Sequence, residues 1–254
     1  MIEYVYGTRR RIFVNTVIGC SSSCKYCYMP NILSDNCCYR ISAEEAINRV
    51  VRMREYFPGK ENTIISLGCY SECMFHDNVK DTMEIIRYFS RKNNYIQLAT
   101  KQNLSEAICQ LIVDSRMFKE QINIYVSMPT YTKIPFWEPG TASLEERVHN
   151  IYLCKKYGIN VVIYIKPYLE NITMKDTEYY IDLVKEYNVP VVVGEYLSTE
   201  VSQISSEVGG GLLYEKNTTK EMERFIEKLS SYTTVYRHST DYINDIRRKE
   251  KHGE

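Results

Sequence analysis

The chain lacks three features that would have pointed to other classes of protein. No run of about 18 apolar residues occurs among its 254 residues, so the sequence predicts no membrane-spanning helix. A basic region followed by an apolar run of about 7–15 residues is also missing from the start, so we expect no signal peptide and a cytoplasmic location. Charge of one sign is not in excess, since 32 basic residues face 32 acidic ones. The balance of charge gives no support for a large nucleic-acid-binding surface.

Nine cysteines are present, an odd number that does not suit a set of disulfides in a secreted protein. Three of them lie close together in "IGCSSSCKYCYMP", residues 18–30, at Cys20, Cys24 and Cys27. In a cytosolic chain of this length, such a cluster more often binds metal or takes part in chemistry. The spacing is C-x3-C-x2-C, with no fourth cysteine in the same register.

Short runs rich in β-branched residues alternate with longer amphipathic runs along most of the chain. We expect strands at 11–19, 62–68, 95–100, 122–128, 160–167 and 189–197, and helices at 42–57, 79–92, 104–116, 143–158, 174–187 and 220–232. Six strand–helix units predict a parallel sheet, and six is two short of a closed eight-unit barrel. The sequence therefore predicts a partial (β/α)6 TIM barrel, with a doubly wound sheet as the alternative. We expect this domain to span residues 1–235 and a polar, basic tail to follow at 236–254.

The three cysteines directly follow the first expected strand, at the carboxyl edge where reactive groups of such folds collect. A zinc site would need a fourth ligand from elsewhere in the chain, and unused thiols are a further alternative. The interpretation we favour is a [4Fe–4S] cluster held by three thiolates, which leaves one iron without a protein ligand. S-adenosylmethionine (SAM) can bind that iron through its amino and carboxylate groups. One electron then breaks a carbon–sulfur bond and yields a 5′-deoxyadenosyl radical.

A loop of this kind after the first strand of a partial barrel, with Tyr26 before the last cysteine, resembles the radical SAM superfamily. The resemblance narrows to spore photoproduct lyase and its relatives, on "CKYCYMP" (24–30), "GCYSE" (68–72), "ATKQN" (99–103) and the stretch 123–167 that contains "EPGTAS". It covers residues from about 11 to about 168. It implies a [4Fe–4S] cluster and SAM as cofactors, and a reducing protein such as flavodoxin or ferredoxin as partner.

The resemblance also implies roles for individual residues. The cluster ligands would be Cys20, Cys24 and Cys27, and the residues around SAM would be Tyr26, Ser71, Lys101 and Ser127. Lys101 would meet the SAM carboxylate, Ser127 the ribose and Ser71 the amino group. For each of these three residues, a solvated loop residue or a packed strand end is the plainer alternative.

A hydrogen-atom donor is implied as well. Cys69 matches the position of a cysteine that returns a hydrogen atom to the substrate radical, and a weak S–H bond suits that role. Tyr26 and Tyr28 flank Cys27, and the resemblance implies that they pass a radical back so that SAM is regenerated. The alternative for Cys69 is an inert cysteine that packs in the core.

Two further groups of residues could have other roles. Arg147 would ordinarily be a surface arginine of the helix at 143–158, and it could also be a partner of Glu138. Cys69, Cys73 and His76 repeat the spacing of the first motif and could form a second metal site.

Three classes of function remain open. The first is a lyase that repairs a pyrimidine lesion in DNA, and the second is a radical SAM enzyme acting on a nucleotide, a peptide or a metabolite. A metal-binding module without catalysis is the third. The short basic runs at 9–11 and 246–251 could contact nucleic acid, and Gly209–Gly211 could form a turn or a substrate-contacting loop. The zero net charge and the early position of Cys20 favour the second class over the first.

Overall fold

The computed structural model describes residues 3–33, 38–197, 214–215 and 219–253 of the chain. The predicted turn at Gly209–Gly211 lies outside the described residues. None of the described helices is both long and apolar enough to cross a membrane.

The central sheet has eight strands in the order β1-β2-β5-β6-β7-β8-β10-β13. These are β1 (Val5–Thr8), β2 (Arg11–Val14), β5 (Ile64–Leu67), β6 (Ile96–Thr100), β7 (Ile122–Ser127), β8 (Asn160–Ile165), β10 (Val191–Val193) and β13 (Val235–Tyr236). Every neighbouring pair is parallel except β1 and β2, which are antiparallel. Since β1 and β13 are the two edges of the sheet and are not paired, the barrel is open and the predicted partial barrel is confirmed.

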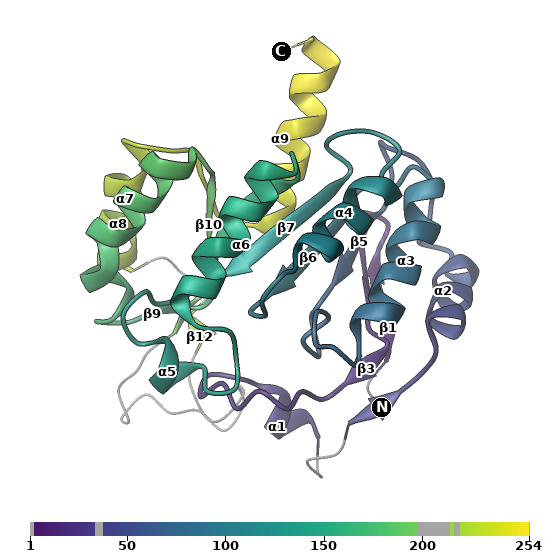
Figure 1. Ribbon diagram of the computed structural model, residues 1–254, viewed down its shortest axis with the longest axis horizontal. Coiled ribbons are helices and arrows are strands. Elements are labelled where there is room, and N and C mark those ends of the chain that lie inside the picture. Colours follow the sequence, from purple (N-terminus) through teal and green to yellow (C-terminus); the bar gives the residue numbers. More distant parts are fainter. Residues whose placement is uncertain (1–2, 34–37, 198–213, 216–218, 254) are drawn as a thin grey trace.

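Six helices follow the six expected strands in turn and cover the outside of the sheet (Figure 1). They are α2 (Ala43–Arg52), α3 (Val79–Arg91), α4 (Glu106–Ser115), α6 (Leu144–Lys156), α7 (Thr177–Tyr187) and α8 (Lys220–Ser230). Serine or threonine side chains cap four of them, and the cap of α6 is a complete capping box between Ser143 and Glu146. Strand β7 is buried along its whole length because the helices cover one face and the barrel interior lies on the other.

The structure also contains several short elements, and most of them lie in the loops at the carboxyl ends of the strands. They are β3 (Val17–Ile18), α1 (Met29–Ile32), β4 (Tyr39–Arg40), α5 (Ile134–Trp137), β9 (Tyr168–Leu169), the 3-10 helix η1 (Thr173–Asp176), β11 (Tyr196–Leu197) and β12 (Tyr214–Glu215). The expected strands 11–19 and 189–197 are therefore each divided in two. Their second halves leave the central sheet and pair with other short strands, β3 with β4 and β11 with β9 and β12.

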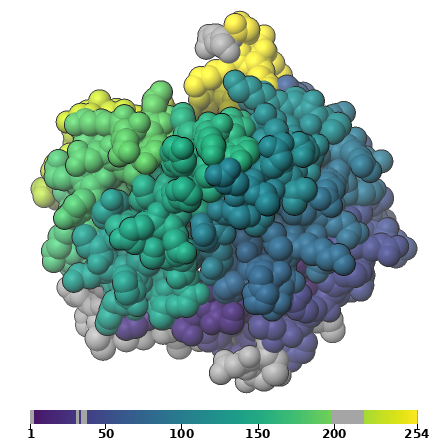
Figure 2. All heavy atoms as spheres, in the orientation of Figure 1, coloured from purple at the N-terminus to yellow at the C-terminus, as the bar shows by residue number. Residues whose placement is uncertain are grey.

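The chain from residue 236 to 252 is folded, although the sequence marks 236–254 as a polar tail. It completes β13 and forms α9 (Ser239–His252), whose last turns project from the surface (Figure 2). Ser239 and Ile243 are buried. The Ser239 hydroxyl accepts hydrogen bonds from Arg11 (3.0 Å) and Gln97 (3.2 Å), which lie at the amino ends of β2 and β6. Helix α9 thus begins inside the barrel and closes its amino end.

Candidate active site

The three motif cysteines lie on the loop between β3 and α1, and all three are half-buried. They line one cavity of about 600 Å³ inside the barrel. The loop is fixed by backbone hydrogen bonds, among them one of 2.9 Å from Lys25 N–H to the carbonyl of Trp137 in α5. The sequence therefore places Cys20, Cys24 and Cys27 correctly at the carboxyl end of the barrel.

Burial keeps two of the three motif thiols protonated when no metal is bound. Burial raises the pKa of Cys24 to about 12, although the charge of Lys101 acts against it. Burial also raises the pKa of Cys27. Thiols of this kind keep their protons at neutral pH until a positive charge such as iron displaces them.

No set of three His, Cys, Asp or Glu side chains within the described part of the chain is placed to hold a single metal ion. In a [4Fe–4S] cluster, by comparison, the three thiolates would each bind a different iron, so their sulfur atoms need not converge on one point.

The predicted SAM residues Ser71, Lys101 and Ser127 line the same cavity as the cysteines, and so does Tyr26. Lys101 follows β6, where its backbone N–H donates to a carboxylate oxygen of Glu72 at 2.8 Å. Burial acts to lower the pKa of Lys101, but the charges of Glu138 and Cys24 outweigh it and the pKa is raised. Lys101 is therefore a cation beside the cysteine loop.

Ser127, at the end of β7, is 1% exposed, and its hydroxyl has no hydrogen-bond partner in the described chain. A buried hydroxyl that lacks a partner costs free energy, which a ligand in the cavity would recover. The position fits contact with a sugar hydroxyl, and the assignment of Ser71, Lys101 and Ser127 to SAM stays a prediction.

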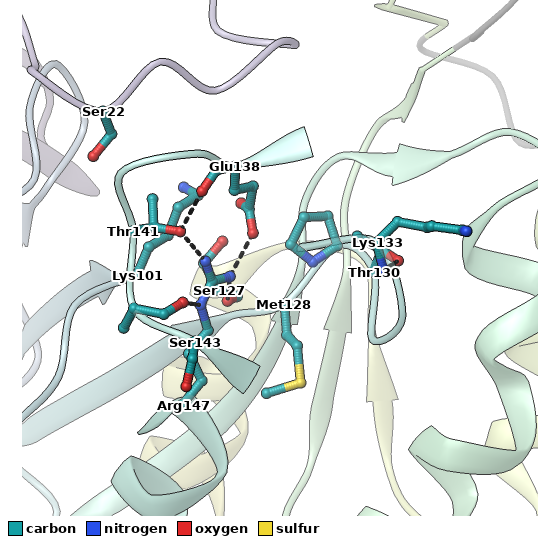
Figure 3. A network of polar contacts seen from close by, with 12 residues as sticks. Ser22, Lys101, Ser127, Met128, Thr130, Lys133, Glu138, Thr141, Ser143 and Arg147 are labelled. Carbon is teal, nitrogen blue, oxygen red and sulfur yellow. Dashed lines mark hydrogen bonds and ion pairs between the residues drawn. The ribbon is translucent and has the colours of Figure 1, made fainter. Parts of the chain in front are cut away.

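A buried network connects the cysteine loop to β7 (Figure 3). The Arg147 guanidinium pairs with Glu138 at 2.5 Å, and neither side chain has any exposed surface. Arg147 also donates to the carbonyl of Ser127 at 2.8 Å, and the Tyr26 hydroxyl donates to the other oxygen of Glu138. The expectation of a surface arginine is wrong, whereas the expected partnership with Glu138 is confirmed. The network fixes Tyr26, next to the cysteines, relative to the strand end that carries Ser127.

The thiol of Cys69, just after β5, also faces the cavity. It lies 2.9 Å from the hydroxyl of Tyr6 and 3.5 Å from that of Tyr28, which also donates to the Cys69 carbonyl at 3.2 Å. Tyr6 stacks on Tyr70 with ring centroids 5.1 Å apart. The structure thus brings Cys69 together with Tyr28, while the hydroxyl of Tyr26 turns to Glu138.

Tyr6 was missed because the short strand β1 was not predicted. The alternation in "YVYGT" and "RIFV", separated by two arginines, is the signal of a hairpin that could have found it.

The second metal site proposed at Cys69, Cys73 and His76 is wrong for the described structure. Cys73 is buried, and burial holds its pKa well above the usual range. His76 is exposed and pairs with Asp77 at 2.8 Å. The three side chains therefore face different surroundings, because the chain turns between them instead of forming a helix.

Comparison with known proteins decides the family. A model of the radical SAM superfamily matches residues 14–184, about two thirds of the chain. The chain belongs to the radical SAM superfamily. Members of this superfamily use a [4Fe–4S] cluster and SAM, so the cofactors predicted from the cysteine loop are confirmed.

Solved structures of other radical SAM enzymes share the fold. Spore photoproduct lyase complexed with dinucleoside spore photoproduct matches with a TM-score of 0.65 at 13% identity, over 88% of this chain and 75% of the lyase. Streptococcus suis SuiB bound to S-adenosylmethionine matches with a TM-score of 0.64 at 12% identity, over 91% of this chain. The match covers 51% of SuiB, so this radical SAM chain spans about half of that enzyme. No curated protein matches the chain in sequence. At these identities the likeness extends to the fold alone.

Proposed function

We propose that the chain is a cytoplasmic enzyme that abstracts a hydrogen atom from a substrate bound inside the barrel, in the manner of spore photoproduct lyase. The observation that carries the proposal is that the three motif cysteines share one cavity with Lys101, Ser127 and Cys69. When cluster and SAM are bound, reductive cleavage of SAM supplies a 5′-deoxyadenosyl radical. The electron would come from a reducing protein such as flavodoxin or ferredoxin.

The residues of the chain would hold the cofactor in place. The Lys101 cation would pair with the SAM carboxylate, since its charge is favoured by the surrounding carboxylates. The Ser127 hydroxyl would bond to the ribose, and Ser71 would meet the amino group. Glu138 and Arg147 would act as positioning residues, because they fix Tyr26 and the end of β7 relative to each other.

Cys69 would return a hydrogen atom to the product radical. The S–H bond breaks, the product gains the hydrogen atom, and a thiyl radical is left on Cys69. A tyrosine O–H would then give its hydrogen atom to the sulfur, and the tyrosyl radical would recover a hydrogen atom from 5′-deoxyadenosine, so that the radical returns to the cofactor and SAM is regenerated. Tyr6 and Tyr28 both lie within hydrogen-bond reach of the thiol, and burial raises the pKa of each, so both hydroxyls are protonated donors.

Two classes of substrate have support. The likeness to a lyase crystallised with dinucleoside spore photoproduct supports a pyrimidine lesion in DNA. The likeness to SuiB, crystallised with the precursor peptide SuiA, supports a peptide. The cavity of about 600 Å³ would hold SAM and, beside it, only a small molecule or one residue of a larger one. This limit favours a compact substrate group over a wide contact surface.

The test is anaerobic reconstitution followed by incubation with SAM and a reductant, with and without dithymine-containing DNA. We expect an iron–sulfur absorption band and formation of 5′-deoxyadenosine, which the DNA increases if it is the substrate. About one zinc per chain and no iron–sulfur absorption would instead identify a metal-binding module without this chemistry.

Recycling of SAM has its own test once a substrate is known. Cys69→Ala should still consume substrate, but with altered products and about one 5′-deoxyadenosine per turnover, because the first abstraction needs no thiol. The wild type should form far less than one molecule of 5′-deoxyadenosine per molecule of product. If the wild type and Cys69→Ala both form one 5′-deoxyadenosine per turnover and give the same product, SAM is consumed and Cys69 is not the hydrogen-atom donor.

A further inference from the structure

The amino end of the cavity is lined by a set of mostly polar residues that the proposed function does not use. We call it the cavity floor, and it consists of Arg11, Phe13, Ser66, Gln97 and Ser239. These residues come from β2, β5, β6 and α9, and the Ser239 hydroxyl joins them by accepting from both Arg11 and Gln97. The cysteine loop lies at the other end of the same cavity.

Two buried oxygen atoms of the cavity floor lack partners. Gln97 is 7% exposed and Ser66 is 2% exposed, and neither the Gln97 Oε1 atom nor the Ser66 Oγ atom has a hydrogen bond in the described structure. The two residues are direct partners in the register of β5 and β6, so their side chains lie side by side. Because an unpaired buried polar atom is costly, these two atoms are poised for a ligand.

Arg11 supplies a charge to the same place. Its guanidinium lies over the ring of Phe13, 4.4 Å from the centroid, and this contact holds it in position. Among the described residues it forms no ion pair, and the carboxylate of Glu195, which also lines the cavity, is bonded to Lys166 at 2.7 Å. A guanidinium offers several N–H donors in a planar fork that matches a carboxylate or a phosphate.

We propose that the cavity floor binds the oxyanion of the substrate. Arg11 would hold a carboxylate or phosphate, Ser66 would donate to it, and the Gln97 oxygen would accept from an N–H or O–H of the same molecule. The substrate is then a small molecule or a terminal residue that carries both groups and extends from the floor toward Cys69. The inference rests on the proposed function, because it takes the occupant of the cavity to be the substrate.

Calorimetric titration of the reconstituted protein with SAM bound tests the proposal. The probes are inorganic phosphate and N-acetylalanine, which has a carboxylate and an N–H, with chloride keeping ionic strength constant. Arg11→Gln should lower the affinity for both probes by about 10–100-fold, because it removes a charge-assisted pair. Gln97→Leu should lower the affinity for N-acetylalanine more than the affinity for phosphate, because it removes the oxygen that would accept from the N–H of N-acetylalanine. Arg52→Gln, which removes an exposed charge at the end of α2, is the matched control and should change neither.

Gln97→Glu is a second variant, in case Arg11→Gln loosens the contact with α9. It keeps the shape of Gln97 but places a carboxylate beside Arg11, so it should abolish binding of both probes. Equal affinities in wild type, Arg11→Gln and Gln97→Glu would overturn the proposal, and so would the absence of any binding to wild type. Iron content and 5′-deoxyadenosine formation, measured on the same samples, report separately on whether the proposed radical chemistry holds.

Discussion

The two ends of the barrel cavity differ in how completely their polar groups are paired. At the carboxyl end, Glu138 has both oxygens engaged, by Tyr26 and by Arg147, and Lys101 lies among opposite charges. At the amino end, Ser66 and Gln97 each keep a buried oxygen without a partner. The carboxyl end is thus largely organised before a cofactor binds and leaves the Ser127 hydroxyl for a ligand, whereas the floor keeps two buried oxygen atoms unpaired until a ligand binds. The paired groups at the carboxyl end of the barrel therefore contribute to stability, and the unpaired groups of the floor contribute to ligand specificity.

The largest effect should come from the cysteine loop. Cys24→Ala removes a thiolate that no neighbouring side chain replaces, so we expect loss of the iron–sulfur absorption and of SAM cleavage. Cys38→Ala, at an exposed cysteine outside the cavity lining, should keep both. A Cys24→Ala protein with full iron content would show that the carboxyl end does not hold the cluster as proposed.

The next largest effect should be on stability. Glu138→Gln leaves Arg147 buried without its counter-charge, which should lower the free energy of unfolding by roughly 3–5 kcal/mol. Arg49→Gln removes one partner of an exposed pair with Glu45 on α2 and should cost at most about 0.5 kcal/mol. Urea unfolding of the three proteins measures both effects. Similar costs for the two variants would mean that the buried network does not organise the carboxyl end.

A smaller effect is expected on cofactor affinity. Lys101→Ala should keep the cluster but weaken SAM binding by about 10–150-fold, which corresponds to roughly 1.5–3 kcal/mol for a charge-assisted contact. Lys133→Ala, at an exposed lysine on the same side of the barrel, serves as the control. Equilibrium binding of SAM to the reconstituted proteins gives the ratio. An unchanged affinity in Lys101→Ala would remove this lysine from the SAM site.

The smallest effect should come from Tyr6→Phe, which removes one hydroxyl next to Cys69. Loss of a single neutral hydrogen bond costs roughly 0.5–1.5 kcal/mol. The direct measurement is the infrared S–H stretch of Cys69, identified by its absence in Cys69→Ala. It should shift more in Tyr6→Phe than in Tyr28→Phe, because Tyr6 is closer to the sulfur (2.9 Å against 3.5 Å). The reverse order would assign the thiol contact to Tyr28.

The site at the carboxyl end of the barrel could be predicted from the sequence, because most of its residues lie in the loops that directly follow regular strands. Cys20, Cys24 and Cys27 fall within eight positions. Lys101 follows a strand that reads clearly as buried, and Ser127 lies at the end of another. The position of Arg147 was predicted wrongly, because its burial depends on a loop that folds back to bring Glu138 alongside.

The amino end could not be predicted in the same way. Helix α9 is mostly polar and contributes few buried side chains, such as Ile243, so its composition resembles that of a tail. Its contacts with Arg11 and Gln97 join parts of the chain that are far apart, and no local pattern specifies them. The contact of Tyr6 with Cys69 was missed for a related reason, since β1 is only four residues long and forms the edge of the sheet.

Helix α9, which closes the amino end of the barrel, has a consequence for how the chain folds during its synthesis. The bond between Arg11 and Ser239 joins residues 228 positions apart, whereas Tyr26 and Glu138 are 112 apart. At a synthesis rate of roughly 5–20 residues per second, Ser239 follows Arg11 out of the ribosome after roughly ten to fifty seconds. Contacts that close such long loops form late in folding. The end that holds the cysteines can therefore take shape on a nascent chain whose barrel is still open at the opposite end.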